Sequence, residues 1–166
     1  MLTLLNEIIT RTRQHHAIEH ATIHLLASQV RGKSISGLSD PLGFTIYGDV
    51  EEEQVRHAVG NALLRLQAGE HNLAIHPNCG TSLVTTALLA TFAATLASVG
   101  RIGRRRSLVE KIALALPLVV VALVFSKPLG LHLQSYTTLA DVADRWVVDV
   151  SAVKVGKINA TRVISE

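Results

Sequence analysis

Two long uncharged runs dominate the second half of the chain. Residues 81–100 hold no charged side chain over 20 positions, and residues 112–126 hold none over 15. Both runs are apolar all round rather than on one helical face, and the first has the length, about 20 residues, of a helix that crosses a bilayer core. The second is shorter, but Lys111 and Lys127 flank it and lysine side chains can reach the membrane surface. We therefore expect a two-helix transmembrane hairpin over 81–127.

The same runs would also suit two buried helices of a soluble core, and the orientation of a hairpin is open. The connecting segment 101–111 carries five cations and one anion, which favours the cytoplasmic side. That orientation would place residues 1–80 outside the cell. The first thirty residues, however, lack the long apolar region of a secretory signal. The two criteria conflict, so the membrane orientation stays unresolved.

A small α+β unit is predicted before the hairpin. Apolar residues recur at helical spacing from Leu2 to about Val30, which indicates one long helix or two in tandem. The stretch 33–43 is rich in turn-forming residues. Two short strand-like segments then enclose a helix that would begin at a capping box of Asp49 and Glu52. The pattern thus predicts a strand–helix–strand unit over 44–48, 50–67 and 72–76.

The C-terminal tail is rich in β-branched residues over 146–165 and predicts one or two strands. The chain is therefore expected to be an α+β membrane protein, integral and multi-pass in the cell membrane, with the lipid bilayer as its partner. It would have three parts: a histidine-rich metal-site domain over 1–80, the transmembrane hairpin over 81–127, and a membrane-proximal tail over 128–166.

Composition fits a membrane protein and limits the partners. Hydrophobic residues make up 48% of the 166 positions and charged residues only 17%, away from the balance of soluble proteins. The net charge of +3 is too small to indicate a nucleic-acid partner, and none is expected. The single cysteine, Cys79, excludes an intrachain disulfide and must be buried filler, a metal ligand or a nucleophile.

Four histidines and a glutamate crowd the stretch "RQHHAIEHATIHLL" near the N-terminus. Its core reads H-x-x-E-H, which on a helix places His16 and His20 one turn apart on one face with Glu19 beside them. Inverted zincins use this motif, with two imidazoles as zinc ligands and the glutamate as general base. His24 would either extend the same face or simply be exposed, whereas His15 would be solvated or support a ligand.

A second cluster, "HPNCGT", stands directly before the first apolar run. Two residues separate His76 from Cys79, a spacing common for ligand pairs on turns. Cys79 would lie near the N-terminus of the next helix, where backbone amides favour a thiolate. Together the two clusters offer four donors that suit zinc best, and we expect them to converge: His16, His20, His76 and Cys79.

Three sequence blocks resemble the YqhQ-like proteins, an uncharacterised family of predicted metal-dependent membrane enzymes. The blocks are "HAIEHATIH" (16–24), "HPNCGTSL" (76–83) and "GLHLQSYTT" (130–138), in the order of that family. The resemblance implies a membrane-proximal metal site formed by His16, His20, His76 and Cys79 with Glu19 nearby. It implies no substrate, and the segment 35–75 and the number of spans differ from that family.

Three functions agree with these residues. The first is a zinc-dependent hydrolase, of peptidase or amidase type, that acts on an unknown peptide or membrane-proximal substrate with Glu19 as the catalytic base. The second is a non-catalytic membrane scaffold or accessory subunit with a closed structural zinc site. The third is a metal-free acyl-transfer enzyme in which His20 or His76 activates Cys79 as a nucleophile. Whether the protein is an enzyme is therefore open.

Overall fold

The computed structural model describes residues 2–30, 32–76, 79–98 and 107–166, and it divides into two compact units. The first, here called the sheet unit, comprises Met1–His76 and Ser135–Glu166. The second, here called the helical unit, comprises Pro77–Gln134.

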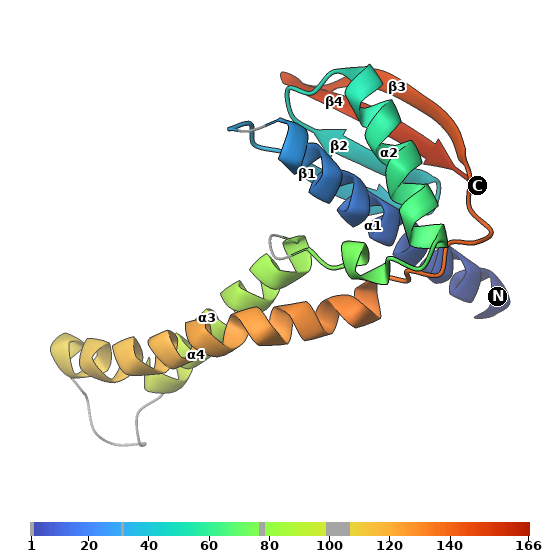
Figure 1. Cartoon of the computed structure of the whole chain (residues 1–166). Helices are drawn as coiled ribbons and strands as arrows, with labels where there is room; N and C mark the ends of the chain where they lie inside the picture. The colour runs from blue at the N-terminus through green and yellow to red at the C-terminus, as the bar shows by residue number, and fades with distance from the viewer. Residues whose placement is uncertain (1, 31, 77–78, 99–106) are drawn as a thin grey trace. The chain divides into compact units, whose positions relative to one another are not determined.

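The sheet unit is a four-stranded antiparallel sheet with two helices on one face (Figure 1). The strands run in the order β1-β2-β4-β3, so the C-terminal strand β4 lies between β2 and β3. The elements are, in chain order, α1 (Leu2–Gln29), β1 (Ser36–Asp40), β2 (Gly43–Tyr47), α2 (Glu52–Gln67), the 3-10 helix η1 (His71–Ala74), β3 (Val147–Val155) and β4 (Ile158–Ser165).

The hydrophobic core fills the space between the sheet and the two helices. Phe44 on β2 and Val150 on β3 both face Val163 on β4 in the sheet register, and all three are buried. Ile18 on α1 and Val55 on α2 belong to the same buried cluster. Burial of these side chains, each stabilising by about 1.5–3 kcal/mol, holds the helices on the sheet.

The predicted α+β class is confirmed, and most predicted elements form. Residues 2–29 make one continuous helix, 44–47 lie in a strand, and the expected helix over 50–67 is α2. The β-branched tail over 146–165 forms the hairpin of β3 and β4. Local periodicity was therefore a sound guide wherever an element packs a whole face against the core.

The prediction of a strand over 72–76 is wrong, because this segment contains η1 instead. The position beside β2 that it would need is occupied by β4 from the far end of the chain. Leu73 and Ala74 of η1 are buried in the core nonetheless. The stretch 33–43, whose residues predict turns, also differs, because it contains strand β1.

The start of α2 differs from the predicted capping box by two positions. Glu51, rather than Asp49, is the N-cap residue, and it forms a reciprocal capping box with Gln54. Glu52 instead accepts a hydrogen bond from the backbone N–H of Ala152 on β3, at 2.9 Å. Asp49 pairs with Lys33 at 3.3 Å. The glutamate that the pattern assigned to the cap thus fastens α2 to the sheet.

The helical unit contains two apolar helices, α3 (Gly80–Ser98) and α4 (Leu108–Thr137, whose last three residues belong to the sheet unit). Within the unit, Thr86 donates to Ser126 at 3.0 Å, and Gln134 donates to Ser82 at 2.9 Å. A Cβ on Gly130 would lie 2.9 Å from the Cα of Ser82. Small residues and hydroxyl bonds at a helix contact are typical of helix packing in membranes.

Both helices are long and apolar enough to cross a membrane, by length and composition. The second is longer than the predicted 112–126, since α4 continues through Pro117 and Pro128 and ends at Thr137. The predicted tail over 128–166 thus begins as helix. The basic segment 101–106, which supports the orientation argument, lies outside the described residues.

Two glycines provide a matched test of the fold. Gly43 begins β2 at φ +147°, and a Cβ there would lie 2.1 Å from the carbonyl oxygen of Val163. Gly60 lies in the middle of α2, and a Cβ there would meet nothing within 4 Å. Gly43→Ala should lower the free energy of unfolding by about 1–3 kcal/mol, because the left-handed region strains any residue with a Cβ. Gly60→Ala should raise it by about 0.5–1 kcal/mol.

Urea unfolding of the full chain in mild detergent, followed by circular dichroism, measures both changes. Equal effects of the two substitutions would contradict the strand geometry at Gly43.

Candidate metal centre

His16 and His20 lie one turn apart on α1 with their rings in contact. The ring centroids are 4.3 Å apart and the planes are inclined at 67°. His20 is buried, with 2% of its surface exposed, whereas His16 is partly exposed. The predicted pairing of the two imidazoles on one helical face is therefore present.

Main-chain carbonyl groups hold both rings. The Nδ1 atom of His16 lies 3.0 Å from the carbonyl oxygen of Thr137, at the end of α4. The Nδ1 atom of His20 lies 2.6 Å from the carbonyl oxygen of Ala74, in η1. A carbonyl oxygen only accepts hydrogen bonds, so in the neutral rings each Nδ1 carries the hydrogen and each Nε2 keeps a lone pair. This is the arrangement of metal-binding histidines, whose second nitrogen donates to a carbonyl or carboxylate.

His76 lies next to His20 and also next to His24. Its ring centroid is 6.1 Å from that of His20 and 6.3 Å from that of His24. In the sheet unit, His16 and His20 are thus in ring contact, and His76 lies beside His20 and His24. The sequence leaves open whether His24 extends the histidine face of α1 or is simply exposed; its ring lies beside that of His76, and its side chain is exposed.

Cys79 belongs to the helical unit, so its part in the site stays a prediction. It stands directly before α3, and its carbonyl oxygen accepts the first helical hydrogen bond, from Leu83 at 3.2 Å. Its sulfur lies 3.4 Å from the backbone nitrogen of Thr81, which donates to it. The expectation that Cys79 lies at the start of a helix is confirmed. A backbone N–H and the helix dipole both favour the thiolate form of this sulfur.

Glu19, the predicted catalytic base, is buried against strand β1. Its Oε2 atom accepts a hydrogen bond of 2.5 Å from the hydroxyl of Ser39. Beside this carboxylate lies Gly37, where a Cβ would be 2.3 Å from Oε1. Neither Ser39 nor Gly37 had a sequence signal, because both lie in a stretch that looks like an ordinary turn. The catalytic role of Glu19 stays a prediction.

His15 is fully buried, so the prediction that it might be solvated is wrong. Its Nδ1 atom lies 2.8 Å from the carbonyl oxygen of Asp40, and burial of the ring lowers the pKa of His15. The side chain of Asp40 pairs with Arg162 through bonds of 2.6 and 2.9 Å, which lower the pKa of that carboxyl group. His15 therefore fastens α1 to the end of β1 and is a structural residue.

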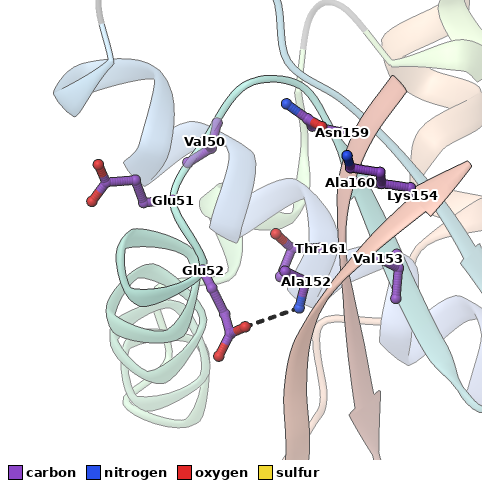
Figure 2. Close-up of a pocket in the computed structure, with 9 residues that line it drawn as sticks. All are labelled: Val50, Glu51, Glu52, Ala152, Val153, Lys154, Asn159, Ala160 and Thr161. Atoms are coloured by element: carbon purple, nitrogen blue, oxygen red, sulfur yellow. Dashed lines mark hydrogen bonds between the residues drawn. The ribbon is translucent and has the colours of Figure 1, made fainter. Parts of the chain in front are cut away.

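A separate open pocket of about 340 Å³ lies between the start of α2 and the β3–β4 hairpin (Figure 2). Glu52 crosses part of it through the bond to Ala152, and Lys154 and Asn159 also line it. Among the residues that line this pocket there is no histidine or cysteine of the predicted site. It is therefore distinct from the histidine cluster.

Residues 11–150 match a family described as Domain of unknown function (DUF6391). The chain belongs to this family. The matched range of the DUF6391 domain includes every predicted site residue: His16, Glu19, His20, His76 and Cys79.

An uncharacterised protein of Picosynechococcus sp. (strain ATCC 27264 / PCC 7002 / PR-6) is 40% identical over 86 residues. The match covers 46% of this chain and 42% of that protein, so it spans less than half of the relative. No solved structure matches the chain. The resemblance to the YqhQ-like proteins stays a prediction.

The contact between Gly37 and Glu19 can be tested by a double-mutant cycle. Gly37→Ala should lower the free energy of unfolding by about 1–3 kcal/mol, because the new methyl group overlaps a carboxylate that burial prevents from moving aside. In a Glu19→Ala background the same substitution should lose most of that cost, since the space is then open. Urea unfolding of the four variants measures the coupling. An equal cost of Gly37→Ala in both backgrounds would contradict the position of Glu19.

Proposed function

We propose that this protein is a zinc-binding membrane protein and that its metal site performs hydrolysis at the membrane surface. The observation that carries the proposal is the pair of carbonyl bonds to the Nδ1 atoms of His16 and His20. Two neighbouring imidazoles that both donate through Nδ1 can use both Nε2 atoms to bind one shared cation.

For the hydrolase, we propose that His16, His20 and Cys79 hold the ion and leave one position open, with His76 as the donor that would close the site if it also bound. His76 is already beside His20, and Cys79 follows it by three residues. Three residues along the chain span at most about 11 Å between Cα atoms, a length that permits both side chains to bind one ion. The thiolate that the start of α3 favours, together with imidazoles, suits zinc better than magnesium or calcium, which prefer oxygen.

The membrane location is supported by the character of α3 and α4. A helix in a soluble core would be mostly buried, yet only 17% and 0% of their most apolar windows are buried. Their exposed side chains include many leucines, valines and phenylalanines, such as Leu88, Phe92, Val124 and Phe125. Apolar side chains that are exposed along two whole helices are unfavourable in water and stable in lipid. We propose that the two helices form a transmembrane hairpin in the cell membrane.

Hydrolysis would rest on Glu19 and an open metal position. Zinc held by three protein ligands lowers the pKa of a bound water toward neutrality. Glu19 would accept the proton of that water, and its hydrogen bond to Ser39 keeps the carboxylate oriented. A peptide or amide bond at the membrane surface is the proposed target.

A structural zinc site is the second candidate, and the position of Cys79 at the N-cap of α3 favours it. If the thiolate and three imidazoles all bind, the site is closed and no position is left for water. Glu19 would then serve only to hold α1 against β1 through Ser39. The protein would be a scaffold or accessory subunit in that case.

Metal analysis of the purified chain tests the proposal. The wild type should contain about one zinc per chain, and His16→Ala, His20→Ala and Cys79→Ala should each lose most of it, since a stable site needs three or four protein ligands. His57→Ala is the matched control, because His57 is an exposed histidine on α2 that pairs with Glu53. It should keep its zinc. A folded, metal-free wild type would exclude both zinc functions and leave the cysteine-nucleophile enzyme.

Cobalt substitution then separates the open site from the closed one. The visible spectrum of an open site should titrate with pH as the bound water loses its proton, and Glu19→Gln should change that titration while it keeps the metal. A closed site should show the same spectrum at every pH, and Glu19→Gln should not alter it.

Membrane location has its own test. Because the apolar surfaces of α3 and α4 would be in lipid, the protein should stay in the membrane fraction after a carbonate or high-salt wash. A variant with Leu88→Glu and Phe92→Glu on the exposed part of α3 should be recovered from membranes in smaller amounts, since charges within the bilayer are unfavourable. Release of the wild type by the wash would contradict the transmembrane hairpin.

A further inference from the structure

Four imidazoles form a continuous row in the sheet unit. Successive ring centroids are 4.3 Å apart from His16 to His20, 6.1 Å from His20 to His76, and 6.3 Å from His76 to His24. Three of them occupy one face of α1, because their spacing of four residues repeats at 16, 20 and 24. The fourth, His76, follows η1 and lies beside two of the others.

Exposure changes along this row. His24 is exposed, His76 is half-buried, and His20 has only 2% of its surface exposed. His24 and His20 thus differ in their access to water, and the ring of His76 lies at nearly the same distance from each of them. A hydrated cation could meet His24 directly, but it could reach His20 only after it had lost most of its water.

We propose that His24 and His76 form an outer divalent-metal site through which the ion enters the inner site at His20 and His16. This inference rests on the proposed zinc site. Two neutral imidazoles would replace two waters of the ion and would hold it weakly enough to exchange. His76 is shared, so the ion gains His20 before it leaves His24, and it need not lose several ligands at once. The step exchanges ligands only and needs no oxidant or proton acceptor.

The alternative is that His24 is simply an exposed residue on a polar helical face. The distance between His24 and His76 favours the outer site, since their ring centroids lie 6.3 Å apart, near the separation of two imidazoles that bind one ion through nitrogens at about 2 Å. His57, an exposed histidine on α2, instead has Glu53 as its partner.

The rate of zinc uptake by the metal-free full-length protein tests the outer site. The protein is mixed in detergent with zinc buffered by a chromophoric chelator, and the rate and the end point are both recorded. His24→Ala should slow uptake several-fold and leave the final zinc content per chain unchanged. His57→Ala should match the wild type, and His24→Asp should restore much of the rate, because a carboxylate is also a zinc ligand.

The possible outcomes separate the outer site from the inner zinc site. Equal uptake rates for wild type and His24→Ala would overturn the outer site and leave the inner zinc site standing. A lower final zinc content in His24→Ala would also overturn it, because His24 would then be an inner ligand. A wild type that takes up no zinc at any concentration would overturn the proposed function itself, and the entry site with it.

Discussion

The need to satisfy the buried polar residues of α1 organises the sheet unit. The helix buries not only an apolar stripe but also a glutamine, two histidines and a glutamate: Gln14, His15, Glu19 and His20. An unpaired buried polar group costs several kcal/mol, so each requires a partner from another element. The partners come from three places in the chain. Strand β1 supplies the carbonyl of Asp40 and the hydroxyl of Ser39, η1 supplies the carbonyl of Ala74, and the segment after α4 supplies the carbonyl of Asp141. A single helix thus fixes β1, η1 and the segment after α4 around itself.

The candidate site is a consequence of this arrangement. Because η1 supplies a carbonyl group to His20, the chain emerges from η1 with His76 beside the histidine face of α1. Because the end of α4 supplies a carbonyl group to His16, the second ring is fixed in the same tautomer. The bonds that compensate for burial are therefore also the bonds that prepare two Nε2 atoms for a cation. Stability and the proposed metal binding depend on the same contacts.

The proposed role in a membrane gives a reason for the two kinds of surface in one short chain. The sheet unit buries its apolar side chains in a core between the helices and the sheet, whereas α3 and α4 bury almost none of theirs. A 166-residue chain can seldom keep such helices in water. The proposed metal site would act on substrates that remain within or close to the lipid.

The sequence by itself determined the features that depend on local spacing. Each of these features has a period or a length that is compatible with only a few kinds of secondary structure. They are the i, i+4 repeat of His16 and His20, the alternation in 44–48, the β-branched tail and the two uncharged runs. The predicted α1, β2, α2 and β3–β4 hairpin follow from these.

Tertiary structure decided the rest, for two physical reasons. Which strand pairs with β2 depends on competition between distant segments, and β4, more than a hundred residues away, excluded the strand expected at 72–76. The partners of His16 and His20 are main-chain carbonyl oxygens, which every residue has. The sequence therefore does not distinguish Ala74 and Thr137 from other residues as hydrogen-bond partners. Only the folded chain shows which of these identical groups meets which ring.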